Sequence, residues 1–148
     1  MPTDTLTPEE TRNLRCLAGM MIPASARYAV PGADDDLIFA DIMRSLGRDR
    51  DDVRAALGRL SAMAGESFAN LATGRRDEIA AALRAEGGSA LMALMRVVLL
   101  CYYRDDRVMR ALDMEPRAPF PKGHVVEQGD WSLLDPVRAR APMWRRPP

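Results

Sequence analysis

Apolar positions recur at three- and four-residue spacing along the first 112 residues, and this spacing predicts five amphipathic helices. The first helix is expected to begin at Pro8, because Thr7 and Glu10 form a capping box around it, and to end before Pro23. The second helix follows three aspartates, which suit a helix N-terminus, and should end at Gly47. An irregular stretch of about a dozen residues therefore separates the first two helices.

The next three helices follow the same spacing. A third is expected to begin near residues 49–51, and a fourth to run from about Arg75 to Ala85. Two glycines stop the fourth helix, and Ser89 is expected to cap a fifth, the most apolar and therefore the central one. The side chains predicted to face inward are Val53, Leu57, Leu60, Ile79, Ala82, Leu83, Leu91, Leu94, Met95, Val98, Leu99 and Tyr102. The run "RDDRVMRALDM" either continues the fifth helix or forms a short sixth one.

The chain changes character at Met114. Seven of its eleven prolines lie between Glu115 and Pro148, which excludes long helices and central strands there. The same stretch nevertheless contains both tryptophans and several other large apolar residues, in which disordered tails are usually poor. We therefore predict an all-α domain of about five helices over residues 1–113 and an extended arm over residues 114–148 that orders on the surface of a partner.

Composition limits the partners that this chain is expected to have. Twenty-one Lys and Arg balance twenty-one Asp and Glu, whereas nucleic-acid binders favour a basic excess. The longest apolar run, residues 90–103, is interrupted by Arg96 and is too short to span a bilayer. The first residues match neither a signal peptide nor a twin-arginine signal. We expect no nucleic acid, no membrane insertion and, from this chain alone, a cytoplasmic location.

Residues able to carry out chemistry are few and scattered. His124 is the only histidine, and no serine or cysteine nucleophile stands beside it. Cys16 and Cys101 lie 85 positions apart, fit no metal or redox spacing, and are expected to be buried free thiols. The acidic run at residues 34–36 lacks the spaced pattern of a calcium loop. The sequence therefore predicts no catalytic, cofactor-binding or metal-binding residue in this chain.

The tail instead favours a protein interface, because arginine and tryptophan are the residues that such interfaces prefer. Acidic residues lie among the arginines of the tail and argue against RNA. The pair Tyr102 and Tyr103 marks the end of the fifth helix, where a structural helix end with paired charges is the simpler interpretation and a polar contact site is the alternative. The candidate partner-binding residues are Tyr102, Tyr103, Phe120, His124, Trp131, Leu133, Leu134, Arg138, Met143 and Trp144.

Two blocks of the sequence resemble the gluconate 2-dehydrogenase subunit 3 family. In the first, "LRCLAGMMIPASARYAVPGADD", a helix leads into an "IPA" segment and a "PGA" turn precedes the second helix. In the second, "VVLLCYYRDDRVMRALDMEPRAPFPKGH", an aromatic pair ends a helix, and a short helix then closes on a turn before a proline-rich exit. Leu112-Asp113-Met114 replaces the Leu-Gly turn that is commoner in the family. The resemblance covers about residues 14–125 and includes no catalytic signature.

The resemblance implies a role. Members of the family are small helical subunits of flavin-dependent dehydrogenases that oxidise sugars, sugar acids and other alcohols. The large subunit belongs to the glucose-methanol-choline (GMC) oxidoreductase family and holds FAD, and a cytochrome c often receives the electrons. The small subunit supports folding or export of the large one, and many members have a twin-arginine signal. Here the complex is expected to be cytoplasmic, or periplasmic if the partner has the export signal.

The sequence therefore predicts a non-catalytic small subunit that binds and stabilises an FAD-containing dehydrogenase subunit. Two alternatives stay open. A self-contained helical enzyme or ligand-binding protein would have a closed pocket within residues 7–112. An adaptor for an unrelated protein would co-purify with no flavoprotein.

Overall fold

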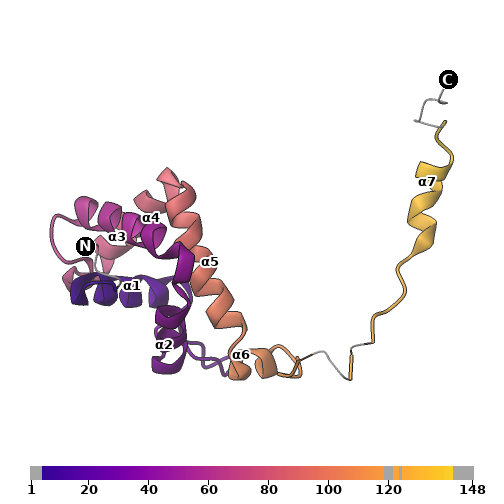
Figure 1. The fold of residues 1–148 in the computed structure, drawn as a ribbon, viewed down its shortest axis with the longest axis horizontal. Helices are drawn as coiled ribbons and strands as arrows, with labels where there is room; N and C mark the ends of the chain where they lie inside the picture. Colours follow the sequence, from indigo (N-terminus) through magenta and orange to yellow (C-terminus); the bar gives the residue numbers. More distant parts are fainter. Residues whose placement is uncertain (1–4, 119–121, 124, 142–148) are drawn as a thin grey trace. The chain divides into compact units, whose positions relative to one another are not determined.

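The structure is a computed structural model that describes residues 5–118, 122–123 and 125–141 (Figure 1). The chain divides into two compact units, Met1–Pro116 and Arg117–Pro148, where the sequence predicted a boundary after residue 113. All regular secondary structure of the described residues is helical, which confirms the all-α fold class. The one β-like feature among them is an isolated bridge between Ser25 and Val30.

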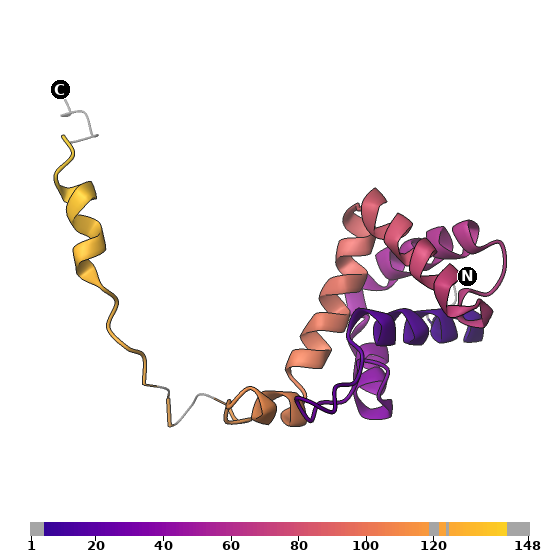
Figure 2. The ribbon, with the colours of Figure 1, turned by 180° about the vertical axis from the view of Figure 1, so that it is seen from behind.

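The first unit is a bundle of helices. Its α-helices are α1 (Pro8–Met21), α2 (Asp36–Ser45), α3 (Arg50–Ala64), α4 (Thr73–Glu86), α5 (Ser89–Tyr103) and α6 (Asp106–Ala111), with 3₁₀ turns at Gly47–Asp49 and Phe68–Asn70. Helix α5 packs along α2 and α3, and α3 also packs against α1 and α4 (Figures 1 and 2). The predicted central position of α5 is therefore shared with α3, which has neighbours on more sides.

Local signals explain the starts of the first two helices. Thr7 Oγ1 accepts a hydrogen bond from the backbone N–H of Glu10 at 3.2 Å, and the N–H of Thr7 donates to Glu10 Oε2 at 2.7 Å. The predicted capping box is thus confirmed. At α2, the Asp35 carboxylate accepts from the backbone N–H groups of Leu37 and Ile38. Of the three aspartates, the middle one is therefore the N-cap.

The buried side chains confirm most of the predicted core. Of the twelve residues predicted to face inward, nine are buried: Val53, Leu57, Leu60, Ile79, Leu83, Leu91, Leu94, Val98 and Tyr102. Met95 is half-buried, and Leu99 is 37% exposed. Ala82 is also exposed, because it lies about 100° around the helix from Leu83, outside the stripe that faces α3. Both cysteines are free thiols as predicted, with Cys101 buried and Cys16 half-buried.

The turn between α4 and α5 differs from the prediction. Gly88 is the N-cap of α5, and Ser89 is already the first helical residue and makes no capping hydrogen bond. The φ of Gly88 is 100°, a conformation that glycine adopts without strain, so the glycine itself makes the sharp turn. In the described part of the chain no single helix is long and apolar enough to cross a membrane. Helices α4 and α5 meet those criteria only as a pair, and the pair is bent by 116°.

The second unit contains one short helical segment. A 3₁₀ turn at Trp131–Leu134 leads into α7 (Asp135–Arg138), and the Asp130 carboxylate caps the turn by accepting from the N–H of Ser132 at 3.0 Å. The predicted extended conformation is therefore wrong for these eight residues, because Pro136 stands in the first turn of a helix, where its missing N–H does no harm. All side chains of residues 125–141 are exposed.

Candidate functional site

The loop between α1 and α2 meets the end of α5 and the start of α6 at one end of the first unit. The Tyr102 hydroxyl, at the end of α5, donates to the carbonyl oxygen of Pro31 at 3.2 Å. The Arg107 guanidinium, on α6, donates to both carboxylate oxygens of Asp35 at 2.7 and 3.2 Å. We call this set of contacts, with Asp105, the junction. It ties the loop between α1 and α2 to a segment about 70 residues further along the chain.

One guanidinium serves two helix caps at the junction. Arg107 also donates to the Asp105 carboxylate at 3.0 Å, and Asp105 accepts from the backbone N–H of Arg107 as the N-cap of α6. Hydrogen bonding to Arg107 lowers the pKa of Asp35 and of Asp105 below their usual values, although burial opposes the shift. Both carboxylates therefore stay ionised near neutral pH and hold the N-termini of α2 and α6 in place.

The loop itself is closely packed at Gly32. A Cβ atom at this position would lie 2.4 Å from Asp34 Oδ1 and 2.9 Å from the backbone nitrogen of Ala24, so the "PGA" turn requires glycine. Arg15 Nε donates to the carbonyl oxygen of Asp34 at 3.0 Å, and Arg15 also pairs with Asp36. These contacts fix the turn to α1 as well as to the junction.

A polar cavity of about 320 Å³ lies beside the junction, between α2 and the end of α5. On its wall, Arg104 Nε donates to Asp41 Oδ2 at 2.6 Å and lowers the pKa of that carboxyl group. Burial raises the pKa of the Cys101 thiol, which therefore stays protonated near neutral pH and is a weak nucleophile. The charged side chains here therefore pair with one another and stabilise the fold.

The lowered pKa values make a prediction about acid stability. A carboxyl group whose pKa is lower in the folded state stabilises the fold above its unfolded value of about 4 and loses that contribution as the pH falls through the folded value. Arg107 lowers the pKa of two such groups, Asp35 and Asp105. The variant Arg107→Gln should therefore lose less stability than the wild type between about pH 5 and pH 2. Urea unfolding at a series of pH values measures this.

A matched control for that measurement is Arg75→Gln. Arg75 pairs with Glu78 on the exposed surface of α4 and contacts neither Asp35 nor Asp105. The stability of Arg75→Gln should decrease with falling pH in the same way as that of the wild type. If Arg107→Gln and the wild type lost stability in parallel as the pH fell, the junction would contribute nothing to the pH dependence.

The outer face of α5 is apolar and exposed. Met92, Leu99, Leu100 and Tyr103 are 59%, 37%, 61% and 54% exposed, although the opposite face of the same helix fills the core. Arg96, the only charged residue of α5, lies on this same face, one turn from Met92 and from Leu100, and pairs with Asp49 at 2.6 Å. A helix that is apolar on both faces is typical of one that is covered on both sides. The spacing of apolar residues predicts that Leu99 faces the core and does not predict this face, although a 15-residue helix with a single charged residue is a signal for it.

The structure separates the sequence-predicted partner-binding residues. Tyr102 is only 4% exposed and holds the junction, so we assign it to the fold rather than to a partner surface. Tyr103, its neighbour, is on the outer face of α5. Trp131, Leu133, Leu134 and Arg138 are exposed in the second unit, where Arg138 pairs with Asp135 at 3.1 Å. The four others, Phe120, His124, Met143 and Trp144, lie outside the described residues.

Metal-ligating side chains do not gather anywhere in the described ranges: no group of three or more His, Cys, Asp or Glu residues there could hold a metal ion. In the described structure the charged side chains of the junction pair with one another and with helix ends. No family model, no curated protein and no solved structure matches this chain.

Proposed function

We propose that this chain is the non-catalytic small subunit of an FAD-dependent dehydrogenase complex that oxidises sugars or related alcohols. It binds and stabilises a large catalytic subunit of the GMC type, which holds the FAD. The family that it resembles often uses a cytochrome c as electron acceptor. The observation that supports this best is the exposure of large apolar side chains in the arm, where Trp131, Leu133 and Val137 are 63%, 74% and 56% exposed.

These side chains favour a protein surface as their binding partner. Burial of each would contribute about 1.5–3 kcal/mol before the cost of ordering the arm. The helical segment that presents them, Trp131–Leu134 followed by Asp135–Arg138, is far shorter than the dozen or so residues that an isolated helix needs in water. The arm is therefore expected to gain its order from the partner. The outer face of α5 offers that partner a second apolar area.

The family assignment rests on the sequence resemblance of two blocks. These blocks lie far apart in the sequence, and in the fold Asp35 of the first block pairs with Arg107 of the second. From the resemblance we propose membership of the gluconate 2-dehydrogenase subunit 3 family, and the proposal of a flavoprotein partner follows from it. The complex is expected in the cytoplasm, or in the periplasm if the partner has the export signal.

Co-expression tests the proposal. The full chain should co-purify with a yellow, FAD-containing protein encoded beside its gene, and deletion of residues 120–148 should leave that protein insoluble or unbound. The double variant Trp131→Ala/Leu133→Ala should weaken the complex by at least about tenfold, because aromatic anchors dominate such interfaces. Dissociation constants for the purified pair measure the effect.

Glu127→Ala is the matched control, because Glu127 is exposed in the same arm but is not a candidate partner-binding residue. Its effect on the affinity should be within about threefold, as expected for a residue outside the apolar anchors of an interface. A truncated chain that binds the flavoprotein as tightly as the full chain would disprove the role of the arm. The absence of any co-purifying flavoprotein would disprove the proposed function itself.

A further inference from the structure

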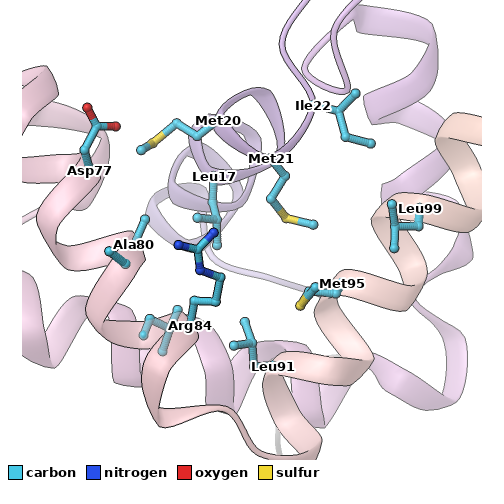
Figure 3. A pocket seen from close by; sticks show the side chains of 12 residues that line it. Leu17, Met20, Met21, Ile22, Asp77, Ala80, Arg84, Leu91, Met95 and Leu99 are labelled. Carbon is cyan, nitrogen blue, oxygen red and sulfur yellow. The ribbon is translucent and has the colours of Figure 1, made fainter.

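A groove of about 410 Å³ opens between α1, α4 and α5 (Figure 3). Helix α1 contributes Leu17, Met20 and Met21 to its walls, and α5 contributes Leu91, Met95 and Leu99. Its volume lies within the range of small-molecule sites, which are mostly apolar with a few placed polar groups. The three methionines can adapt their shape to a ligand, since the side chain is unbranched and flexible.

Two charged residues of α4, Arg84 and Asp77, line this otherwise apolar groove. Arg84, on α4, lines it, and in Figure 3 its guanidinium points into the ring of lining side chains, whereas Asp77 lies at the edge. Within the described residues, Arg84 makes no hydrogen bond or ion pair. The other two arginines of α4 do: Arg75 pairs with Glu78, and Arg76 donates to Cys16 Sγ and Thr73 Oγ1. The groove therefore presents a guanidinium that is available to an anion.

The length of the apolar wall favours a chain-shaped ligand. Leu91, Met95 and Leu99 repeat every four residues, so the apolar wall of α5 is about 12 Å long. An acyl chain of about ten carbons matches that length, and its carboxylate would match the charge of the guanidinium at the groove.

We propose that this groove binds a medium-chain fatty carboxylate, with the acyl chain along α5 and the carboxylate at Arg84. A guanidinium can hold a carboxylate through two parallel hydrogen bonds, and the apolar walls remove the chain from water. The site is an open groove, so it differs from the closed pocket that a self-contained enzyme would need. Ligand binding at this site requires no partner, and the site shares Leu99 with the outer face of α5.

Titration of the full chain with sodium decanoate, below the concentration at which decanoate forms micelles, tests the site. With methyl-labelled methionine, the signals of Met20, Met21 and Met95 should shift in one saturable step. The variant Arg84→Gln should weaken binding at least about tenfold, because a charge-assisted contact is lost. Arg75→Gln is the matched control on the same helix and should bind as the wild type does.

A second variant blocks the groove. Ala81 lines it and is exposed, so Ala81→Trp should fill the space without unfolding the protein and should abolish the shifts. Equal affinity of Arg84→Gln and the wild type, shifts confined to other methionines, or binding only above the micelle concentration would each overturn the proposal. A chain that does not bind decanoate, but whose three groove methionines are protected by the flavoprotein, would also overturn it. The groove would then be a protein-docking surface. All titrations use the chain without a partner, so failure here leaves the subunit proposal standing.

Discussion

Replacing Phe68 by alanine should lower the free energy of unfolding of the first unit by about 3–5 kcal/mol, the usual effect of removing a buried phenyl ring. Phe68 is fully buried, although it lies in a 3₁₀ turn of three residues rather than in a long helix. The turn packs against α1 and α3, so the ring fills space between two helices. Its loss would leave a cavity that the neighbouring helices can close only in part.

The turn that holds Phe68 has its own anchor, which explains why we expect little relaxation. Asn13 is buried on α1, and its Oδ1 accepts from the backbone N–H of Ala69 at 3.0 Å and from Ser67 Oγ at 3.2 Å. These hydrogen bonds keep the backbone of the turn in place after the ring is removed. The cavity should therefore persist, and the loss of unfolding free energy should fall in the upper part of the range of about 3–5 kcal/mol.

Urea unfolding followed by far-ultraviolet circular dichroism measures the change, with the midpoint and the slope fitted separately. Leu37→Ala is the control, because Leu37 is 67% exposed on α2 and its removal should change stability by less than about 0.5 kcal/mol. A loss below about 1 kcal/mol for Phe68→Ala would mean that the turn does not pack as described.

Replacing Asp35 by alanine should lower the free energy of unfolding by about 2.5–3 kcal/mol. The N-cap of α2 would be lost, which costs about 1 kcal/mol. The two hydrogen bonds from Arg107 would be lost as well, at about 1.5–3 kcal/mol for a charged group. Because the Asp35 and Arg107 side chains are 27% and 39% exposed, water screens part of that contribution, and we take the lower half of the range.

Asp36→Ala is a matched control from the same run of aspartates. Asp36 also lies at the start of α2, but its side chain is 89% exposed and its ion pair with Arg15 is on the surface. Its removal should cost less than about 0.5 kcal/mol. The difference between the two variants, measured by urea unfolding at neutral pH, should shrink as the pH falls from about 4 through the lowered pKa of the folded Asp35, because that carboxyl group then becomes protonated. A difference of only about 1 kcal/mol, the effect of the N-cap alone, would show that Arg107 adds nothing at the junction. Equal destabilisation by the two substitutions would contradict the N-cap as well.

Much of the helical unit could be predicted from the sequence because its signals are local. A capping box needs only Thr7 and Glu10, three residues apart, and the buried stripe of α3 follows from the spacing of Val53, Leu57 and Leu60. Local sequence signals did not predict the structure where the backbone conformation is unusual. At the start of α5, Gly88 rather than a serine side chain sets the turn, through a positive φ that spacing does not reveal.

The candidate site and the groove depended on tertiary structure. Asp35 and Arg107 are 72 positions apart, and nothing in either neighbourhood shows that their side chains pair. Tyr102 and Tyr103 are adjacent and chemically identical, yet one is buried at the junction and the other exposed, because only the packing of α5 on α2 distinguishes its two faces. The groove likewise arises between three helices. By itself, the sequence determined where helices begin and which stripe each buries, since those interactions reach three or four residues. Which surfaces meet, and which apolar faces stay uncovered, was decided by the packing of helices far apart in the chain.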